Sequence, residues 1–173
     1  MKNLFTAFLS MFIIACSTPE KNANSKIEIY DDSVLDIIDI YSEIEELADS
    51  ISLPEGPVWD EASQSLLFVD VMGNKLYKWN ENDGTSEYIS PSGNTGYAPN
   101  VDFGLLGANG LLIDENGDII LCQHGDRRLA KINNSSTNSP SFTTLVDNYE
   151  GGRFNSPNDL TLSLIHISEP TRP

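Results

Sequence analysis

The chain has 173 residues with 26 acidic and 10 basic side chains, a formal net charge of -16 at pH 7, so it is long enough for one domain with its own core. Such an acidic surface repels a phosphate backbone, which argues against a nucleic-acid partner; it suits cations, although acidic residues also serve solubility. The two cysteines, Cys16 and Cys122, are too few for a zinc cluster or a disulfide framework.

The N-terminus has the pattern of an export signal. Lys2 precedes an apolar run over residues 4–15, which is too short for a membrane-spanning helix of about 20 residues. The run ends in a small residue and then Cys16, and this resembles the lipobox of bacterial lipoproteins, where the peptide is cut before a cysteine that carries lipid. We therefore expect a signal peptide over residues 1–15, a lipidated Cys16, a polar tether over residues 16–26, and a bacterial cell-envelope lipoprotein that faces the periplasm or lies on the cell surface. An ordinary secretory signal and a buried strand are the alternatives.

Two segments of the central chain repeat each other. Glu55–Trp79 reads EGPVWDEASQSLLFVDVMGNKLYKW, and Asn109–Ile132 reads NGLLIDENGDIILCQHGDRRLAKI. Each contains three apolar or alternating runs separated by polar or glycine-containing turns, and fourth runs follow over residues 86–90 and 142–146. Four short strands per unit, at a period of about 50 residues, predict an all-β fold of β-propeller blades.

A third copy opens at Asn158 with NDLTL, and the pattern then breaks. Both earlier copies turn through a polar segment after the opening run, whereas residues 163–173 continue as SLIHISEPTRP. That string resembles the in-frame translation of an adapter used to build sequencing libraries. We expect it to be non-native, which removes His166 as a catalytic candidate; an unusual edge strand is the alternative. The predicted propeller part, residues 27–162, then holds about two and a half blades.

The repeat places three oxygen-bearing side chains at one register position. Glu55, Asn109 and Asn158 each open the first strand of a unit. The first strand of a propeller blade lines the central channel, so these openings converge near one mouth of it. Carboxylate and amide oxygens suit a hard cation such as calcium or magnesium, whereas zinc more often has His or Cys ligands. Each Asn can instead cap a turn through its side chain.

The motifs EGPVW, NGLLIDENGDIILCQHGDRR and EGGRFNSPNDL occur in this order at blade spacing. Together they resemble the gluconolactonase branch of the senescence-marker-protein/gluconolactonase/luciferin-regenerating-enzyme family, and the likeness covers about residues 43–162. The resemblance implies a six-bladed propeller with a divalent cation in its channel and, in many members, hydrolysis of sugar or other lactones. Calcium is the expected cation, with magnesium and zinc as alternatives.

Carried onto this sequence, the resemblance implies that Glu55 and Asn158 hold the metal and that Arg153 contacts substrate, with Asn155 beside it in the RFN motif. Asn109 is assigned to substrate binding mainly on its register position. Two further ligands of the family, an Asn and an Asp from later blades, have no counterpart here, so we expect this fragment to be inactive.

Two more residues are candidates for catalysis. His124 follows the second strand of its blade, on the predicted side of the site, and can orient substrate or move a proton; a solvated turn histidine is the alternative. Asp159 adjoins Asn158 and can bind, relay a proton or cap a turn. The predicted reaction is attack of water on a lactone carbonyl. The competing hypothesis is a lipid-anchored propeller that binds a ligand without chemistry.

Overall fold

The computed structural model describes residues 27–42, 44–99, 106–135 and 139–163. The predictions for the signal peptide, for Cys16 with its tether, and for the tail from residue 164 onward lie outside these residues. The chain divides into two compact units, Met1–Glu45 and Glu46–Pro173. The described part of the first unit contains a 3-10 helix, η1 (Asp32–Asp36), capped by the side chain of Asp31. Within the described residues, no helix combines the length and apolar character needed to cross a bilayer.

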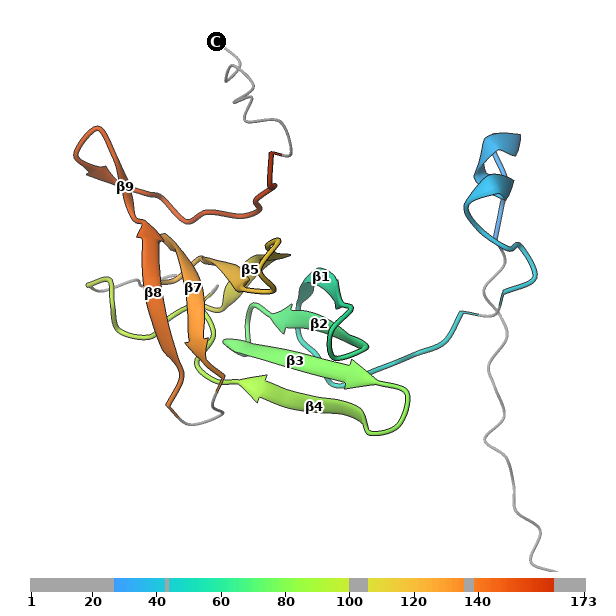
Figure 1. Ribbon diagram of the computed structural model, residues 1–173, viewed down its shortest axis with the longest axis horizontal. Coiled ribbons are helices and arrows are strands. Elements are labelled where there is room, and N and C mark those ends of the chain that lie inside the picture. Colours follow the sequence, from blue (N-terminus) through green and yellow to red (C-terminus); the bar gives the residue numbers. More distant parts are fainter. Residues whose placement is uncertain (1–26, 43, 100–105, 136–138, 164–173) are drawn as a thin grey trace, which may run out of the picture. The chain divides into compact units, whose positions relative to one another are not determined.

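The second unit contains two four-stranded antiparallel sheets, each with its strands in sequence order (Figure 1). The first sheet consists of β1 (Pro54–Asp60), β2 (Ser65–Asp70), β3 (Lys75–Asn80) and β4 (Gly84–Ile89). The second consists of β5 (Ala108–Ile113), β6 (Ile119–Gln123), β7 (Arg128–Asn134) and β8 (Ser141–Val146). A four-stranded meander is the blade of a propeller, so the prediction of an all-β fold built from repeated blades is confirmed.

The start of the third repeat differs from the prediction. A short hairpin of β9 (Asn148–Tyr149) and β10 (Gly152–Arg153) precedes it, and residues 154–163 are described without a strand where the repeat predicts one. The first strand of a blade is held by hydrogen bonds to the second strand of the same blade. No such second strand follows within the described residues, so the repeat pattern alone does not produce a strand here.

The hydrophobic core lies between the two sheets. Side chains alternate between the faces of a strand, and on β2 this turns Leu67 and Val69 toward the second sheet, where both are fully buried. Burying each aliphatic side chain of this size contributes about 1.5–3 kcal/mol. The packing places β1 beside β5, which brings the first strands of the two blades together. The core cluster comprises Leu67, Val69, Val71, Leu76, Ile89, Ala108, Leu111 and Leu121.

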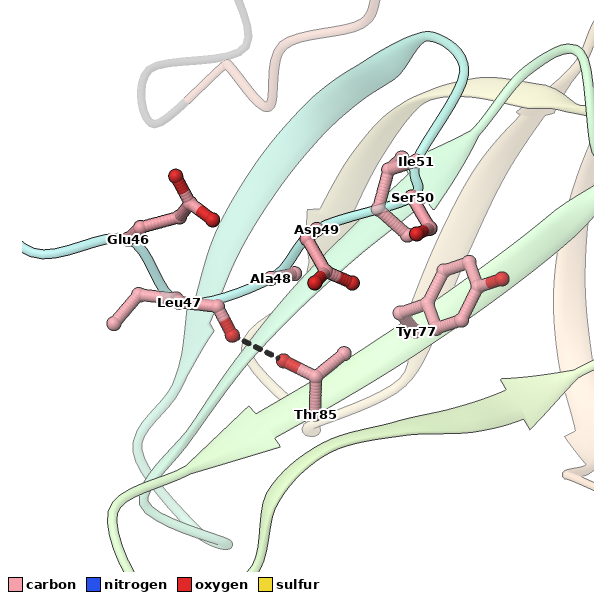
Figure 2. A pocket seen from close by; sticks show the side chains of 8 residues that line it. All are labelled: Glu46, Leu47, Ala48, Asp49, Ser50, Ile51, Tyr77 and Thr85. Carbon is pink, nitrogen blue, oxygen red and sulfur yellow. Dashed lines mark hydrogen bonds between the residues drawn. The ribbon is translucent and has the colours of Figure 1, made fainter. Parts of the chain in front are cut away.

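The segment before β1 is fastened to the first sheet. Figure 2 shows residues 46–51 beside Tyr77 and Thr85, and the Thr85 hydroxyl donates a hydrogen bond of 2.7 Å to the backbone oxygen of Leu47. These residues line a pocket of about 460 Å³. The attachment continues at the end of the segment, because Val71 N–H donates to the backbone oxygen of Leu53 at 3.0 Å.

Asp70 at the end of β2 secures the same segment. It is only 4% exposed, and its carboxylate accepts hydrogen bonds from the backbone N–H groups of Ser52 at 3.2 Å, Leu53 at 3.1 Å and Gly73 at 3.1 Å. Burial on its own raises the pKa of the Asp70 carboxyl, but the backbone hydrogen bonds outweigh burial and hold the pKa below its usual value. The hydrogen bonds that secure this segment therefore favour the charged form of the Asp70 carboxyl.

Candidate functional site

Strand register brings the openings of both blades to one end of the sheets. Pro54 at the start of β1 pairs with Asp70 at the end of β2, and Ala108 at the start of β5 pairs with Gln123 at the end of β6. The later strands are also antiparallel. The connections that follow β2, β4, β6 and β8 therefore leave the sheets at the end where β1 and β5 begin.

A glycine follows the register position in both blades and allows close approach to the next repeat. Gly56 has a positive φ of 54°, and a Cβ added to it would overlap the backbone oxygen of Asn109. A Cβ on Gly110 would lie 2.6 Å from Oδ1 of Asp159 and 3.1 Å from the backbone oxygen of Asn158. The pairings of β1 and β5 both shift register at these glycines. Each blade opening thus packs directly on the backbone of the following repeat, with no room for a side chain between them.

The three register positions gather around one small pocket. Asn109 donates from Nδ2 to Oδ1 of Asn158 at 2.9 Å, and Gly110 N–H donates to the backbone oxygen of Asn158 at 2.8 Å. The pocket has a volume of about 200 Å³ and contains two carboxylate side chains and no basic one. Its lining residues are Glu55, Gly56, Pro57, Asn109, Gly110, Leu111, Asn158 and Asp159.

The donors in this pocket fit a hard divalent cation. Calcium takes carboxylate and amide oxygens, and both kinds are present, from Glu55 and Asp159 and from Asn109 and Asn158. The described residues contain no group of three or more His, Cys, Asp and Glu side chains that could hold a metal, so the two carboxylates of the pocket supply only part of a ligand set. The metal-binding roles of Glu55 and Asn158 and the substrate role of Asn109 stay predictions.

The structure does not bring His124 into this pocket. His124 lies between β6 and β7 and is partly buried, and its Nδ1 is buried without a hydrogen-bond partner among the described residues. Burial lowers the pKa of the His124 imidazole, because a charged ring would lose solvation there. The ring is therefore neutral at pH 7. Its predicted catalytic role stays a prediction.

Asp159, the second candidate for catalysis, does line the pocket. Its Oδ1 accepts a hydrogen bond of 2.8 Å from Leu160 N–H. Cys122 interacts electrostatically with Asp159 and is fully buried. Burial raises the pKa of the Cys122 thiol to about 12, and the charge of Asp159 adds to this effect. Cys122 is therefore a protonated, buried side chain, as its place in β6 predicts.

Arg153 and Asn155 also lie outside the residues that line the pocket. Asn155 is exposed in the stretch after β10. Arg153 donates from Nη1 to the backbone oxygen of Asp126 at 3.5 Å, and its guanidinium carbon lies 5.3 Å from the centre of the Tyr97 ring. The substrate roles of Arg153 and Asn155 stay predictions.

The partners of Arg153 belong to a second polar cluster at the same end of the second blade. Asp126 is fully buried, and its carboxylate accepts from Thr95 N–H at 3.1 Å and Tyr97 N–H at 3.2 Å and pairs with Arg128 at 3.5 Å. Arg128 also lies 3.9 Å from the centre of the Tyr97 ring. Sequence reasoning did not single out this cluster. The charged stretch HGDRR, which contains Asp126 and Arg128, is the sequence feature that could have indicated the cluster. Nothing in the sequence marks Tyr97.

The larger pocket of about 460 Å³ beside residues 46–51 is a weaker candidate (Figure 2). It contains Glu46 and Asp49, but it involves only the first blade and the segment before it. It also holds none of the three register positions. The smaller pocket, which joins three repeats, is therefore the better candidate site.

Comparison with known proteins gives the family. The family described as "SMP-30/Gluconolactonase/LRE-like region" matches residues 53–163. A gluconolactonase of Zymomonas mobilis subsp. mobilis is 36% identical over 137 residues, which cover 78% of this chain and 38% of the relative. A regucalcin of Oryctolagus cuniculus is 65% identical over a short stretch of 26 residues, 15% of this chain and 9% of that protein.

Solved structures agree with this match. An X-ray structure from a structural genomics consortium, described as a "putative gluconolactonase", superposes with a TM-score of 0.62 at 28% identity, over 78% of this chain and 41% of the other. A gluconolactonase of Xanthomonas campestris gives a TM-score of 0.53 at 26% identity, over 68% of this chain and 34% of the other. The chain thus spans well under half the length of these relatives. With its repeated blades and its match over residues 53–163, the chain belongs to the SMP-30/Gluconolactonase/LRE-like family.

Proposed function

We propose that this chain carries the first half of the active site of a lactone hydrolase that opens a sugar lactone such as gluconolactone. The observation that carries the proposal is the pocket that joins Glu55, Asn109 and Asn158, three residues about 50 positions apart that open successive repeats. Membership in a family with gluconolactonases supports the substrate class. The relatives are longer than this chain, so the activity is proposed for a protein of the relatives' length, which we call the whole protein.

The residues of the pocket divide into holding and reacting groups. Glu55 and Asn158 are the proposed cation ligands, completed by ligands from outside this chain. A divalent cation bound there, calcium by preference, would polarise the lactone carbonyl and stabilise the negative charge that develops on its oxygen. The two carboxylates of the pocket attract such a cation through their negative charge, and no basic side chain lines the pocket to oppose this attraction.

Asp159 is the proposed proton acceptor. Its carboxylate lines the pocket next to Asn158, so it can accept the proton of a water molecule that attacks the lactone carbon. The ring C–O bond then breaks, and the leaving alkoxide takes up a proton to give the hydroxy acid. His124 lies outside the pocket, so its neutral ring can supply or relay this proton only if the substrate reaches the ring or its loop moves toward the pocket. Arg153 is proposed to bind sugar hydroxyls or the new carboxylate.

The decisive experiment compares Glu55→Gln with the unchanged whole protein. Gln keeps the size of the side chain and one oxygen but removes the charge, so calcium affinity measured by calorimetry should fall, and hydrolysis of an aldonolactone in a pH-indicator assay should fall steeply. High calcium should restore part of the activity. Asn158→Ala should respond less to calcium, because it loses substrate contacts as well as a ligand.

A matched control removes one acidic charge at a position far from the pocket. Glu115 is exposed in the β5–β6 turn, at the opposite end of the second blade, so Glu115→Gln should leave calcium affinity and activity unchanged. Full activity in Glu55→Gln, or activity in the unchanged protein that a chelator does not affect, would contradict the proposed mechanism. Absence of lactone hydrolysis in the unchanged whole protein would instead favour the lipid-anchored propeller that binds a ligand without chemistry. We also propose the lipid anchor at Cys16 and the cell-envelope location.

A further inference from the structure

Tyr97 connects three segments that are far apart in the sequence. It lies in the connection between β4 and β5, and its backbone N–H donates to the buried carboxylate of Asp126 at 3.2 Å. Its hydroxyl donates to Oδ2 of Asp147 at 2.6 Å, at the start of the β9–β10 hairpin. Its ring lies under the guanidinium of Arg128 at 3.9 Å and that of Arg153 at 5.3 Å. The Tyr97 side chain thus contacts the second blade through Arg128 and the hairpin region through Asp147 and Arg153.

The support on the Arg128 side is rigid. Arg128 is 5% exposed, and it donates from Nε to Gln123 at 2.6 Å and from Nη1 to Thr144 at 2.7 Å. Gln123 is itself fully buried and bonded to the backbone oxygen of Ser92 at 2.8 Å. A guanidinium fixed in this way offers a constant surface to the Tyr97 ring through a cation–π contact.

The Arg153 side is exposed and depends on this support. Arg153 is exposed in the two-residue strand β10, and a free arginine side chain samples many rotamers. Its contacts include the Tyr97 ring and the backbone oxygen of Asp126, and its charge also interacts with the Asp147 carboxylate. The hairpin is closed at its base by Phe154 N–H, which donates to the backbone oxygen of Asp147 at 3.1 Å. Asp147 is the residue that the Tyr97 hydroxyl contacts, so Tyr97 contacts both the arginine and the base of its hairpin.

We propose that Tyr97 is a positioning residue for Arg153: it holds the guanidinium and the β9–β10 hairpin at the site end of the second blade, so that Arg153 meets the substrate in one orientation. This inference rests on the proposed lactone hydrolysis. It assigns no chemical step to Tyr97. Removing Tyr97 should weaken substrate binding and leave the chemical step largely unchanged.

The test uses the whole protein with three variants: Tyr97→Leu, Tyr97→Phe and Arg153→Ala. Tyr97→Leu removes ring and hydroxyl and should raise KM for an aldonolactone about fivefold to tenfold with kcat little changed. Tyr97→Phe keeps the ring that both guanidiniums contact and should raise KM only about twofold to threefold. Arg153→Ala should raise KM at least as much as Tyr97→Leu, and adding Tyr97→Leu to Arg153→Ala should cause no further increase.

A spectroscopic signal separates positioning from a general loss of structure. The ring current of Tyr97 should shift the Nε–H resonance of Arg153, and this shift should disappear in Tyr97→Leu but persist in Tyr97→Phe. The control is Tyr149→Leu, since Tyr149 is 73% exposed in the same hairpin and should leave KM unchanged.

Several outcomes would overturn the inference. They are an unchanged KM in Tyr97→Leu, an equal KM increase from Tyr97→Leu with and without Arg153, an equal effect of Tyr149→Leu, and an unchanged KM in Arg153→Ala. An unchanged KM in Arg153→Ala would also remove the proposed substrate role of Arg153. None of these outcomes changes the result expected for Glu55→Gln, so failure of this inference is distinguishable from failure of the proposed cation-dependent hydrolysis.

Discussion

Gly56 offers a sharp test of how closely the first two blades pack. Replacing it with Ala forces an L-residue into a left-handed conformation at φ 54°, which costs about 1–2 kcal/mol. The new Cβ would also overlap the backbone oxygen of Asn109. That oxygen belongs to the first strand of the second blade, so relief requires a shift of backbone and costs about 1–3 kcal/mol more. The expected total loss in the free energy of unfolding is about 2–5 kcal/mol.

Gly84 provides the matched control. It also has a positive φ, 69°, but a Cβ there would meet nothing within 4 Å. Gly84→Ala should therefore cost only the conformational part, about 1–2 kcal/mol. Urea unfolding of the whole protein, followed by tryptophan fluorescence, measures both losses from the midpoints. Calcium affinity should fall in Gly56→Ala alone, because the displaced Asn109 is hydrogen-bonded to the proposed ligand Asn158. Equal midpoint shifts in the two variants would refute the argument for close packing at Gly56.

Three further outcomes are expected. The lowered pKa of Asp70 means that its stabilising effect is complete above the unfolded-state pKa of about 3.9 and is lost as pH falls through the folded-state pKa. The difference in urea midpoint between the unchanged protein and Asp70→Asn should therefore shrink as pH falls below about 4, and a constant difference would contradict this. The buried Cys122 thiol, with a pKa of about 12, should resist alkylation at pH 8 in folded protein that carries Cys16→Ala and should react once urea unfolds the chain; fast reaction in the folded state would show that the thiol is accessible. Labelling with a radioactive fatty acid in a bacterial host should mark the unchanged protein and not Cys16→Ala, and equal labelling would exclude Cys16 as the lipidation site.

The strands were predictable because their pattern is local. Leu67 and Val69 alternate with partly exposed or oppositely facing residues along β2, and the same four-run unit recurs in the second blade, so one sequence carries two copies of the signal. The register of the repeat also placed Glu55, Asn109 and Asn158 at equivalent positions. The structure gathers them around one pocket, which the repeat could anticipate because equivalent positions of successive blades face the same channel.

The second polar cluster could not be predicted in this way because its contacts are not periodic. Tyr97 lies in a connection rich in Gly, Ser, Asn and Pro, and its place is set by Asp126, which is 29 residues away, and by Asp147, which is 50 residues away. In the third repeat, by contrast, the periodic pattern is present but the strand that it predicts is not. Asn158 has the expected register, but a strand forms only where a neighbour supplies hydrogen bonds, and residues 154–163 have no described second strand beside them.

The pocket also links cation binding to the packing of the blades, because its donors belong to different repeats. Glu55 is on the first repeat, Asn109 on the second and Asn158 on the third. A cation bound by Glu55 and Asn158 would therefore connect the first repeat to the third, in addition to the Asn109–Asn158 hydrogen bond that connects the second to the third. A ligand that binds only the folded state adds RT ln(1 + [L]/Kd) to the free energy of unfolding, about 2.7 kcal/mol at a hundredfold excess over Kd.

Chelation should therefore lower the urea midpoint of the whole protein, and calcium should restore it. The effect should be much smaller in Glu55→Gln, which starts from weaker binding, and unchanged in Glu115→Gln, whose carboxylate is at the far end of the blade. If chelator and calcium leave the midpoint of the unchanged protein where it was, no cation is held between the blade openings. The carboxylates of the pocket would then have to act on the lactone without one.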